Sequence, residues 1–210
     1  MSLIFDYLFG QYSAYDTLDI VLEVLAVIFG FLSVWFSKQN NILVFPTGMI
    51  NTSIFVYLLL KWGLLGDMII NVYYFIMSIY GWYIWSRKVD DTHQTPITSW
   101  TKKDKQISIG IASVSVVFVA VIYQFFNKWI GWVSYVDILT TALFFVGMWL
   151  MAKRKIENWI LLIIGDVISI PLYFYKGFTF TSLQYLGFTI LAIYGYLAWK
   201  KHLNKRTVIA

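Results

Sequence analysis

Seven long apolar runs divide this chain, and they constrain its fold more than any other feature. The runs cover residues 19–36, 42–60, 67–85, 107–126, 136–152, 156–174 and 181–199. Each is close to the ~20 residues that an α-helix needs to cross a bilayer. The sequence is 60% hydrophobic and only 13% charged, which leaves too few charges to cover the surface of a soluble domain of this size. We therefore predict an all-α membrane protein with seven transmembrane helices.

The basic residues predict how these helices are oriented. With seven spans, 13 of the 16 Lys and Arg residues fall on one side of the membrane. That side holds the segment 87–105, the run 153–155 and the C-terminal tail. Because basic loops are retained in the cytoplasm, we expect a cytoplasmic C-terminus and an external N-terminus. The charges lie in short loops between apolar runs, so the net charge of +5 does not indicate a nucleic-acid partner.

The first three and the last three apolar runs resemble each other at a fixed offset. Residues 22–85 align without a gap on residues 136–199, which lie 114 positions later. Gly81 then matches Gly195, and Trp85 matches Trp199. Matches among Leu and Ile follow from composition in an apolar chain, whereas repeated Trp and Gly pairs in one frame do not. We interpret the pattern as an internal duplication.

The unmatched run 107–126 has a role in this scheme. A three-helix unit begins and ends on opposite sides of the membrane, so one extra helix is needed before a second unit can run in the same direction. We therefore predict a 3+1+3 arrangement with two parallel three-helix repeats. Such repeats place a substrate site near the membrane midplane, between the halves.

These boundaries divide the chain into six predicted segments. They are an N-terminal interfacial segment 1–18, repeat one 19–86, a cytoplasmic loop 87–106, a linker helix 107–127, repeat two 135–200 and a cytoplasmic tail 201–210.

Polar side chains inside the apolar runs are the candidate site residues, because their burial in hydrocarbon is costly. Asn51 lies halfway along the second run. Asp166 lies halfway along the sixth run, at the position that matches Thr52 in the repeat frame. Asp166 is the only carboxylate deep in a run, and either ligand contact or helix packing explains it. Lys176, two residues beyond the end of this run, is its candidate partner.

Further candidates form helical stripes on the third and seventh runs. Gln184 lies on a sparse stripe of the seventh run, and the third run carries a denser one. The third-run stripe recurs at three- and four-residue steps and contains Asn71, Tyr74, Ser78, Trp82 and Trp85. Amides combined with aromatic rings suit a flat polar ligand, because rings stack on its faces while amides bond to its edges.

Some of these residues also have a purely structural interpretation. The Ser78 hydroxyl can bond to its own helix. Trp residues at the ends of runs can anchor a helix in the membrane interface, which applies to Trp35, Trp85, Trp149 and Trp199. Of the third-run stripe, Trp82 is the ring that we expect to face a ligand.

The sequence offers no residue set for catalysis, a metal or a cofactor. It contains no Cys, and both His residues lie in polar segments. No nucleophile–base pair and no Gly-rich phosphate loop is present. We therefore expect no cofactor and no enzyme activity. An intramembrane enzyme is a remote alternative, since it would need a catalytic set around Asp166.

Several motifs together resemble the PnuC family of bacterial vitamin transporters, over about residues 20–202. They are Phe45-Pro46-Thr47-Gly48, Tyr80-Gly81-Trp82 and Glu157-Asn158-Trp159. The resemblance implies a SWEET-like multi-pass fold in the bacterial inner membrane and a homotrimer. It also implies facilitated diffusion of nicotinamide riboside for NAD biosynthesis, with uptake driven by a cytoplasmic kinase that phosphorylates the product.

The resemblance leaves the substrate open between nicotinamide riboside and thiamine or another vitamin or nucleoside. For a riboside it implies stacking on Tyr74, Trp82 and Tyr173, and hydrogen bonds from Asn51, Asn71 and Gln184. Asp166 would contact the ribose or act in gating. Asn71 departs from the family pattern, since many riboside-carrying members have the longer Gln at this position.

Overall fold

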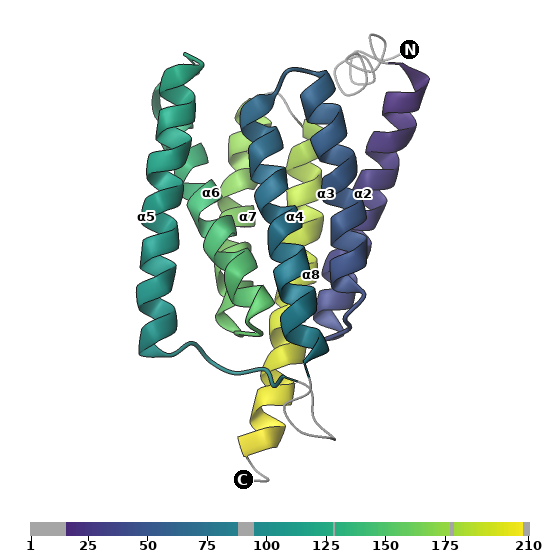
Figure 1. The fold of residues 1–210 in the computed structure, drawn as a ribbon, viewed down its shortest axis with the longest axis vertical. Helices are drawn as coiled ribbons and strands as arrows, with labels where there is room; N and C mark the ends of the chain where they lie inside the picture. The colour runs from purple at the N-terminus through teal and green to yellow at the C-terminus, as the bar shows by residue number, and fades with distance from the viewer. Residues whose placement is uncertain (1–15, 88–94, 128, 177–178, 208–210) are drawn as a thin grey trace.

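The computed structural model of the chain is a helical bundle (Figure 1). It describes residues 16–87, 95–127, 129–176 and 179–207. Within these ranges there are seven long α-helices and no strand. The helices are α2 Thr17–Lys38, α3 Val44–Lys61, α4 Leu65–Ser86, α5 Lys102–Phe125, α6 Gly131–Ala152, α7 Glu157–Tyr175 and α8 Thr179–Thr207. Most of the predicted interfacial segment 1–18 lies outside the described residues.

Six helices pack in a closed ring, and α5 lies outside it. Within each half, the second helix packs between the first and the third, which gives the neighbours α2–α3–α4 and α6–α7–α8. Contacts between α4 and α6 and between α8 and α2 complete the ring. The helix α5 packs mainly on α6 and forms one edge of the bundle (Figure 1).

The helices α2 to α7 are each long and apolar enough to cross a membrane. Their outward faces are apolar, as with Ile109 of α5, which is 67% exposed, and Ile76 of α4, which is 56% exposed. Such faces suit hydrocarbon rather than water. The helix α8 does not meet the same criterion, because Thr181, Ser182 and Gln184 lower the hydropathy of its first half. The chain is therefore a multi-pass membrane protein with six clear spans among the described residues.

The turns after α2 and α6 have the same construction. Asn40 and Arg154 both adopt left-handed backbone angles, with φ of 57° and 52°. The two residues lie 114 positions apart, as the sequence repeat requires. Asn accepts this conformation readily, whereas Arg does so rarely, which indicates that contacts of the Arg154 side chain stabilise the second turn.

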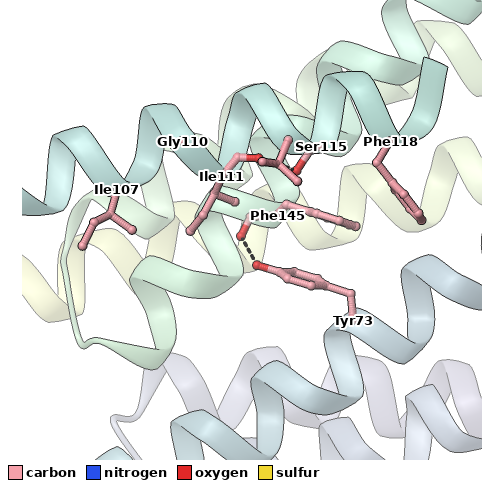
Figure 2. A pocket seen from close by; sticks show the side chains of 8 residues that line it. Tyr73, Ile107, Gly110, Ile111, Ser115, Phe118 and Phe145 are labelled. Atoms are coloured by element: carbon pink, nitrogen blue, oxygen red, sulfur yellow. Dashed lines mark hydrogen bonds between the residues drawn. The ribbon is translucent and has the colours of Figure 1, made fainter. Parts of the chain in front are cut away.

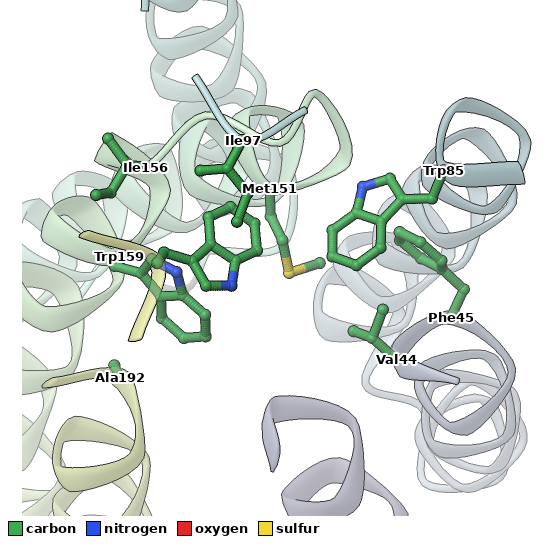
Figure 3. Close-up of a cluster of buried hydrophobic side chains, with 9 residues drawn as sticks. Val44, Phe45, Trp85, Ile97, Met151, Ile156, Trp159 and Ala192 are labelled. Carbon is green, nitrogen blue, oxygen red and sulfur yellow. The ribbon is translucent and has the colours of Figure 1, made fainter. Parts of the chain in front are cut away.

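A cluster of buried apolar side chains closes one end of the ring (Figure 3). We call this the basic end, because Lys38, Arg87 and Lys153 lie there. The aromatic cluster consists of Val44, Phe45, Trp85, Ile97, Met151, Ile156, Trp159, Ala192 and Trp199. Figure 3 shows Phe45 and Trp85 on one side of Met151 and Trp159 on the other.

The predicted anchoring role is wrong for Trp85 and Trp199, which are 1% and 0% exposed. These two rings turn inward and fill the space between the halves. Trp35, at 43% exposed, has the exposure expected of an interfacial anchor.

Matching contacts recur in the two halves of this cluster. Phe45 meets Trp85 edge to face at 5.0 Å, and Trp159 meets Trp199 edge to face at 5.6 Å. Each pair joins the second and third helices of its half at equivalent repeat positions. The matched residues Gly81 and Gly195 lie against the second-helix rings of these two pairs.

A Cβ atom added at Gly81 would lie 2.2 Å from the Phe45 ring, and one at Gly195 would lie 2.5 Å from the Trp159 ring. Both distances are far below van der Waals contact. These two positions therefore need Gly so that a ring can press against the helix backbone.

Candidate functional site

Asp166 lies halfway along α7, with its side chain in the interior of the ring. The residue is only 5% exposed. It forms no hydrogen bond and no ion pair within the part of the chain that the structure describes. Tyr74 of α4 and Tyr185 of α8 lie within electrostatic range of its carboxylate. Because α4 and α7 belong to different halves, the carboxylate faces the region between the halves.

Aromatic rings from four helices surround this level of the bundle. The Tyr74 ring packs edge to face on Phe145 at 5.8 Å. The Tyr185 ring stacks on Phe144 at 6.0 Å and tilts against Tyr173 at 5.1 Å. A buried carboxylate among ring faces is suited to an organic cation, since ring faces and the carboxylate both attract positive charge.

Asn51 takes part in the contact between α2 and α3. Its Nδ2 donates a hydrogen bond of 2.7 Å to the Ala26 carbonyl oxygen in α2. The neighbouring Gly30 lies against both Asn51 and Phe188, since a Cβ there would be 3.1 Å and 3.8 Å from their side chains. Phe188 lies one turn from Tyr185 on α8, so Asn51 and Asp166 flank the same stretch of that helix. The Asn51 Oδ1 makes no hydrogen bond to the described residues and remains an available acceptor.

Lys176 does not pair with Asp166, contrary to the sequence-based expectation. Its Nζ forms a salt bridge of 2.5 Å with Asp137 of α6. The same carboxylate accepts a hydrogen bond of 2.9 Å from the Tyr123 hydroxyl of α5. Lys176 Nζ also lies 4.9 Å from the centroid of the Tyr173 ring. This polar group occupies the end of the bundle opposite the basic end and ties α5, α6 and α7 together.

The third-run stripe does not come together as one surface. The Ser78 hydroxyl donates to the Tyr74 carbonyl oxygen at 2.9 Å, which is the structural alternative that the sequence offered. The Asn71 Nδ2 donates to the carbonyl oxygen of Asp67 in its own helix at 3.0 Å. Trp82 is 41% exposed and shares the outer side of α4 with Ile79 and Tyr83, which are 50% and 55% exposed.

Helix geometry explains why the Trp82 and Tyr74 side chains point in different directions. Each four-residue step along an α-helix overruns a full turn by about 40°. Two such steps, from Tyr74 through Ser78 to Trp82, therefore rotate the side chain by roughly 80°, away from the inner face. Gln184 is half-buried near the start of α8, and no hydrogen bond to it is found among the described residues.

Residues 95–101 form a strap across the basic end that the sequence did not reveal. The strap leads into the start of α5 along the bottom of the bundle in Figure 1. Its Thr98 N donates to the Arg154 carbonyl oxygen, and Ile156 N donates to the Thr98 carbonyl oxygen, both at 3.0 Å. Ile97, which is 8% exposed, enters the aromatic cluster. The strap therefore fastens the end of the first half to the α6–α7 turn of the second.

Side chains of the basic run reinforce the strap. The Arg154 guanidinium donates to the Thr95 carbonyl oxygen and lies 4.1 Å from the centroid of the Trp85 ring. Burial lowers the pKa of Arg154 to about 10, so the guanidinium stays charged at neutral pH. Lys155 Nζ contacts Asp104 and the Thr98 hydroxyl, both at 3.0 Å. The basic run 153–155 thus has a structural role in addition to the membrane orientation that its charge predicts.

Comparison with known proteins gives consistent matches. The family model described as nicotinamide mononucleotide transporter matches residues 20–201. The nicotinamide riboside transporter PnuC of Escherichia coli is 24% identical over 208 residues, which cover 88% of this chain and 87% of that protein. The riboflavin/roseoflavin transporter RibM of Streptomyces davaonensis is 24% identical over 127 residues, which cover 59% of this chain and 58% of that protein.

A solved structure shares the fold. The crystal structure of the vitamin B3 transporter PnuC superposes with a TM-score of 0.66 at 22% sequence identity, covering 97% of this chain and 91% of that one. The fold and these matches define the class as a multi-pass helical membrane transporter rather than an enzyme. Within this class, the chain belongs to the PnuC family, the family of the nicotinamide mononucleotide transporter model. The family predicted from the sequence motifs is thereby confirmed.

Proposed function

We propose that the chain carries nicotinamide riboside across the bacterial inner membrane by facilitated diffusion. The observation that carries the proposal is Asp166, a buried carboxylate without a partner among the described residues, at mid-depth between the two halves. The pyridinium ring of the riboside would neutralise this charge. Aromatic faces near the same level would add a cation–π contribution of roughly 0.5–2 kcal/mol.

The proposed binding group draws on both halves of the chain. Asp166 and Tyr74 would contact the pyridinium cation, and Tyr173 would add a stacking surface beside Tyr185. The free Oδ1 of Asn51 would accept a hydrogen bond from a ribose hydroxyl. Asn71 and Gln184 lie nearer the end opposite the basic end, where they would meet a substrate on its way in. The back-bonded Ser78 and the outward Trp82 do not join this group.

Thiamine is the alternative substrate, because its thiazolium ring is also an aromatic cation. Riboflavin, carried by a relative named RibM, has no fixed positive charge. A buried carboxylate therefore favours either cation over a flavin.

We extend the proposal to the membrane topology. The chain would have seven spans in a SWEET-like 3+1+3 order, with parallel repeats at 19–86 and 135–200, the linker helix 107–127 between them and α8 as the seventh span. The matched Gly–ring contacts support the two repeats. At 29 residues, α8 is roughly 43 Å long, which exceeds the ~30 Å of hydrocarbon that it must cross. The basic end, with the loop 87–106 and the tail 201–210, would face the cytoplasm.

The remaining parts of the proposal are a homotrimer and coupling to metabolism. A passive transporter only equalises substrate on the two sides. A cytoplasmic kinase that phosphorylates the product would remove free substrate and so maintain inward flow into NAD biosynthesis.

Uptake into proteoliposomes tests the function directly. The wild-type chain should take up radiolabelled nicotinamide riboside or thiamine, and failure with both would overturn the transport proposal. Asp166→Asn keeps the shape of the side chain and removes its charge. Because a hydrogen bond or contact to a charged group contributes about 1.5–3 kcal/mol, we expect a roughly 10- to 100-fold weaker apparent affinity for the cation.

A matched control lies at the equivalent position of the first half. The Thr52 hydroxyl is occupied by the Gly48 carbonyl oxygen at 2.9 Å, so Thr52→Val should leave the affinity unchanged. Equal affinities for Asp166→Asn and wild type would remove Asp166 from the site while leaving the transport function standing.

A further inference from the structure

A groove lies outside the ring, between α5 and the α4–α6 pair (Figure 2). It has a volume of about 460 Å³. Most of its lining comes from one face of α5, and α4 and α6 contribute one ring each. The lining residues are Ile107, Gly110, Ile111, Val114, Ser115, Phe118, Tyr73 and Phe145. Asp166 is not part of this lining, although Phe145 also contacts the Tyr74 ring near Asp166.

The groove offers no free polar group to a ligand. The Tyr73 hydroxyl donates to the Phe145 carbonyl oxygen at 2.9 Å, as Figure 2 shows. The Ser115 hydroxyl donates to the Ile111 carbonyl oxygen at 2.7 Å. With both hydroxyls occupied, the groove is suited to an apolar chain and not to a polar substrate.

The length of the groove matches one leaflet of a bilayer. Ile107 and Phe118 are eleven positions apart on α5, which corresponds to roughly 16 Å along the helix axis. Half of the hydrocarbon core is about 15 Å thick. A second apolar hollow, lined by Ser113, Val114, Val117 and Phe118, adjoins the first. An acyl chain laid along α5 would therefore be covered over its length.

A positive charge stands at the polar end of the groove. Lys103 lies one turn before Ile107 and continues the face formed by Gly110 and Val114. Its side chain is exposed and forms no ion pair or hydrogen bond within the described ranges. The nearby Lys155 is already paired with Asp104. Lys103 is thus placed to attract an anionic head group at the membrane surface.

We propose that this groove binds one anionic phospholipid, with an acyl chain along α5 and its phosphate at Lys103. The apolar groove would contact the acyl chain, and the positive charge at its end would contact the head group, as in a lipid the head group follows the chain. The lipid would fill the space between α5 and α4, which the helices leave unfilled. It would hold the linker helix against both halves of the bundle.

Native mass spectrometry after extraction from bilayers of equal phosphatidylglycerol and phosphatidylcholine tests the proposal. Beyond its own helix turn, nothing lies within 4 Å of a Cβ built at Gly110, so the ring of Gly110→Phe has room to enter the groove. We expect the wild type to retain a phospholipid and Gly110→Phe to reduce its occupancy at least tenfold. Ile109→Phe, at a 67% exposed site on the outer face of the same helix, should retain it as the wild type does.

The head-group contact is tested separately. Lys103→Gln should keep the bound lipid but lose the preference for phosphatidylglycerol severalfold, whereas the exposed Lys102→Gln should keep that preference. Unchanged occupancy in Gly110→Phe, or unchanged preference in Lys103→Gln, would overturn the proposal. If Gly110→Phe instead dissociates an oligomer in the same spectra, the lipid proposal is overturned. The groove would then be an interface between copies of this chain. None of these results depends on which substrate is transported.

Discussion

Trp85 and Trp199 lie with their ring centroids 5.9 Å apart, although 114 positions separate them in the chain. Each lies near the basic end of the third helix of its half, and each packs against a ring from the second helix of that half. The pair is therefore the point where the two halves meet at the basic end. If substrate passes through the ring, as proposed, this contact and the strap beneath it must separate during transport.

The two Trp residues differ in one contact, which predicts unequal effects of substitution. Trp199 Nε1 donates to the Ser37 carbonyl oxygen at 2.9 Å, whereas Trp85 Nε1 has no hydrogen-bond partner among the described residues. Phe preserves an aromatic ring and removes the donor. We expect Trp199→Phe to destabilise the protein by about 1 kcal/mol more than Trp85→Phe, because it leaves a buried carbonyl without its donor. Thermal unfolding of the two variants in detergent measures the difference, and equal midpoints would contradict this account.

The matched Gly residues predict a second effect on stability. Gly81→Ala and Gly195→Ala place a methyl group within 2.2 Å and 2.5 Å of a ring, so each should destabilise by about 1–3 kcal/mol. Gly110→Ala is the matched control, since its Cβ meets open space. There the better helix propensity of Ala should raise stability by about 0.5–1 kcal/mol. Losses of similar size at all three positions would indicate a backbone effect rather than contact with the rings.

The strap gives a prediction about local opening. Arg154→Asn accepts the left-handed backbone but loses the contacts of the guanidinium with Thr95 and Trp85. We expect the amides of Thr98 and Ile156, which bridge the strap to the α6–α7 turn, to exchange at least tenfold faster with deuterium. The control is Asn40→Gly at the equivalent first-half position, where exchange at the strap should not change. Unaltered exchange in Arg154→Asn would show that the backbone bridge holds without the side chain.

The sequence predicts the helices well because a membrane span requires an unbroken apolar run. The predicted linker helix 107–127 corresponds to α5 Lys102–Phe125, and the sixth run 156–174 to α7 Glu157–Tyr175. The early start of α5 reflects a capping box, in which the Thr101 hydroxyl accepts from the Asp104 backbone at 3.2 Å. Its lysines are polar, so hydropathy alone places the start of the helix too late.

The candidate site was predicted less completely, because sequence position gives depth in the membrane but only a coarse direction around the helix. The sequence puts Asp166 halfway along the sixth run and Tyr74 on the third-run stripe, and the structure brings the two residues within electrostatic range. Trp82 was placed on the same stripe, yet the drift of four-residue steps turns it outward. The strap could not be foreseen, since the contact of Thr98 with Arg154 joins segments far apart in the chain and follows no periodic pattern.

The pairing of Lys176 provides a final prediction that separates structure from transport. Its salt bridge with Asp137 is largely shielded, with side chains 21% and 15% exposed. Lys176→Met leaves the Asp137 carboxylate without its cation and should destabilise the protein by about 1–3 kcal/mol, the cost of a shielded polar group that loses a partner. The double variant with Asp137→Asn removes both charges and should recover part of that loss, which a double-mutant cycle of thermal unfolding measures. Because Lys176 does not pair with Asp166, folded Lys176→Met should bind substrate in proteoliposomes with wild-type affinity. A loss of affinity equal to that of Asp166→Asn would instead show that the two residues act together during transport.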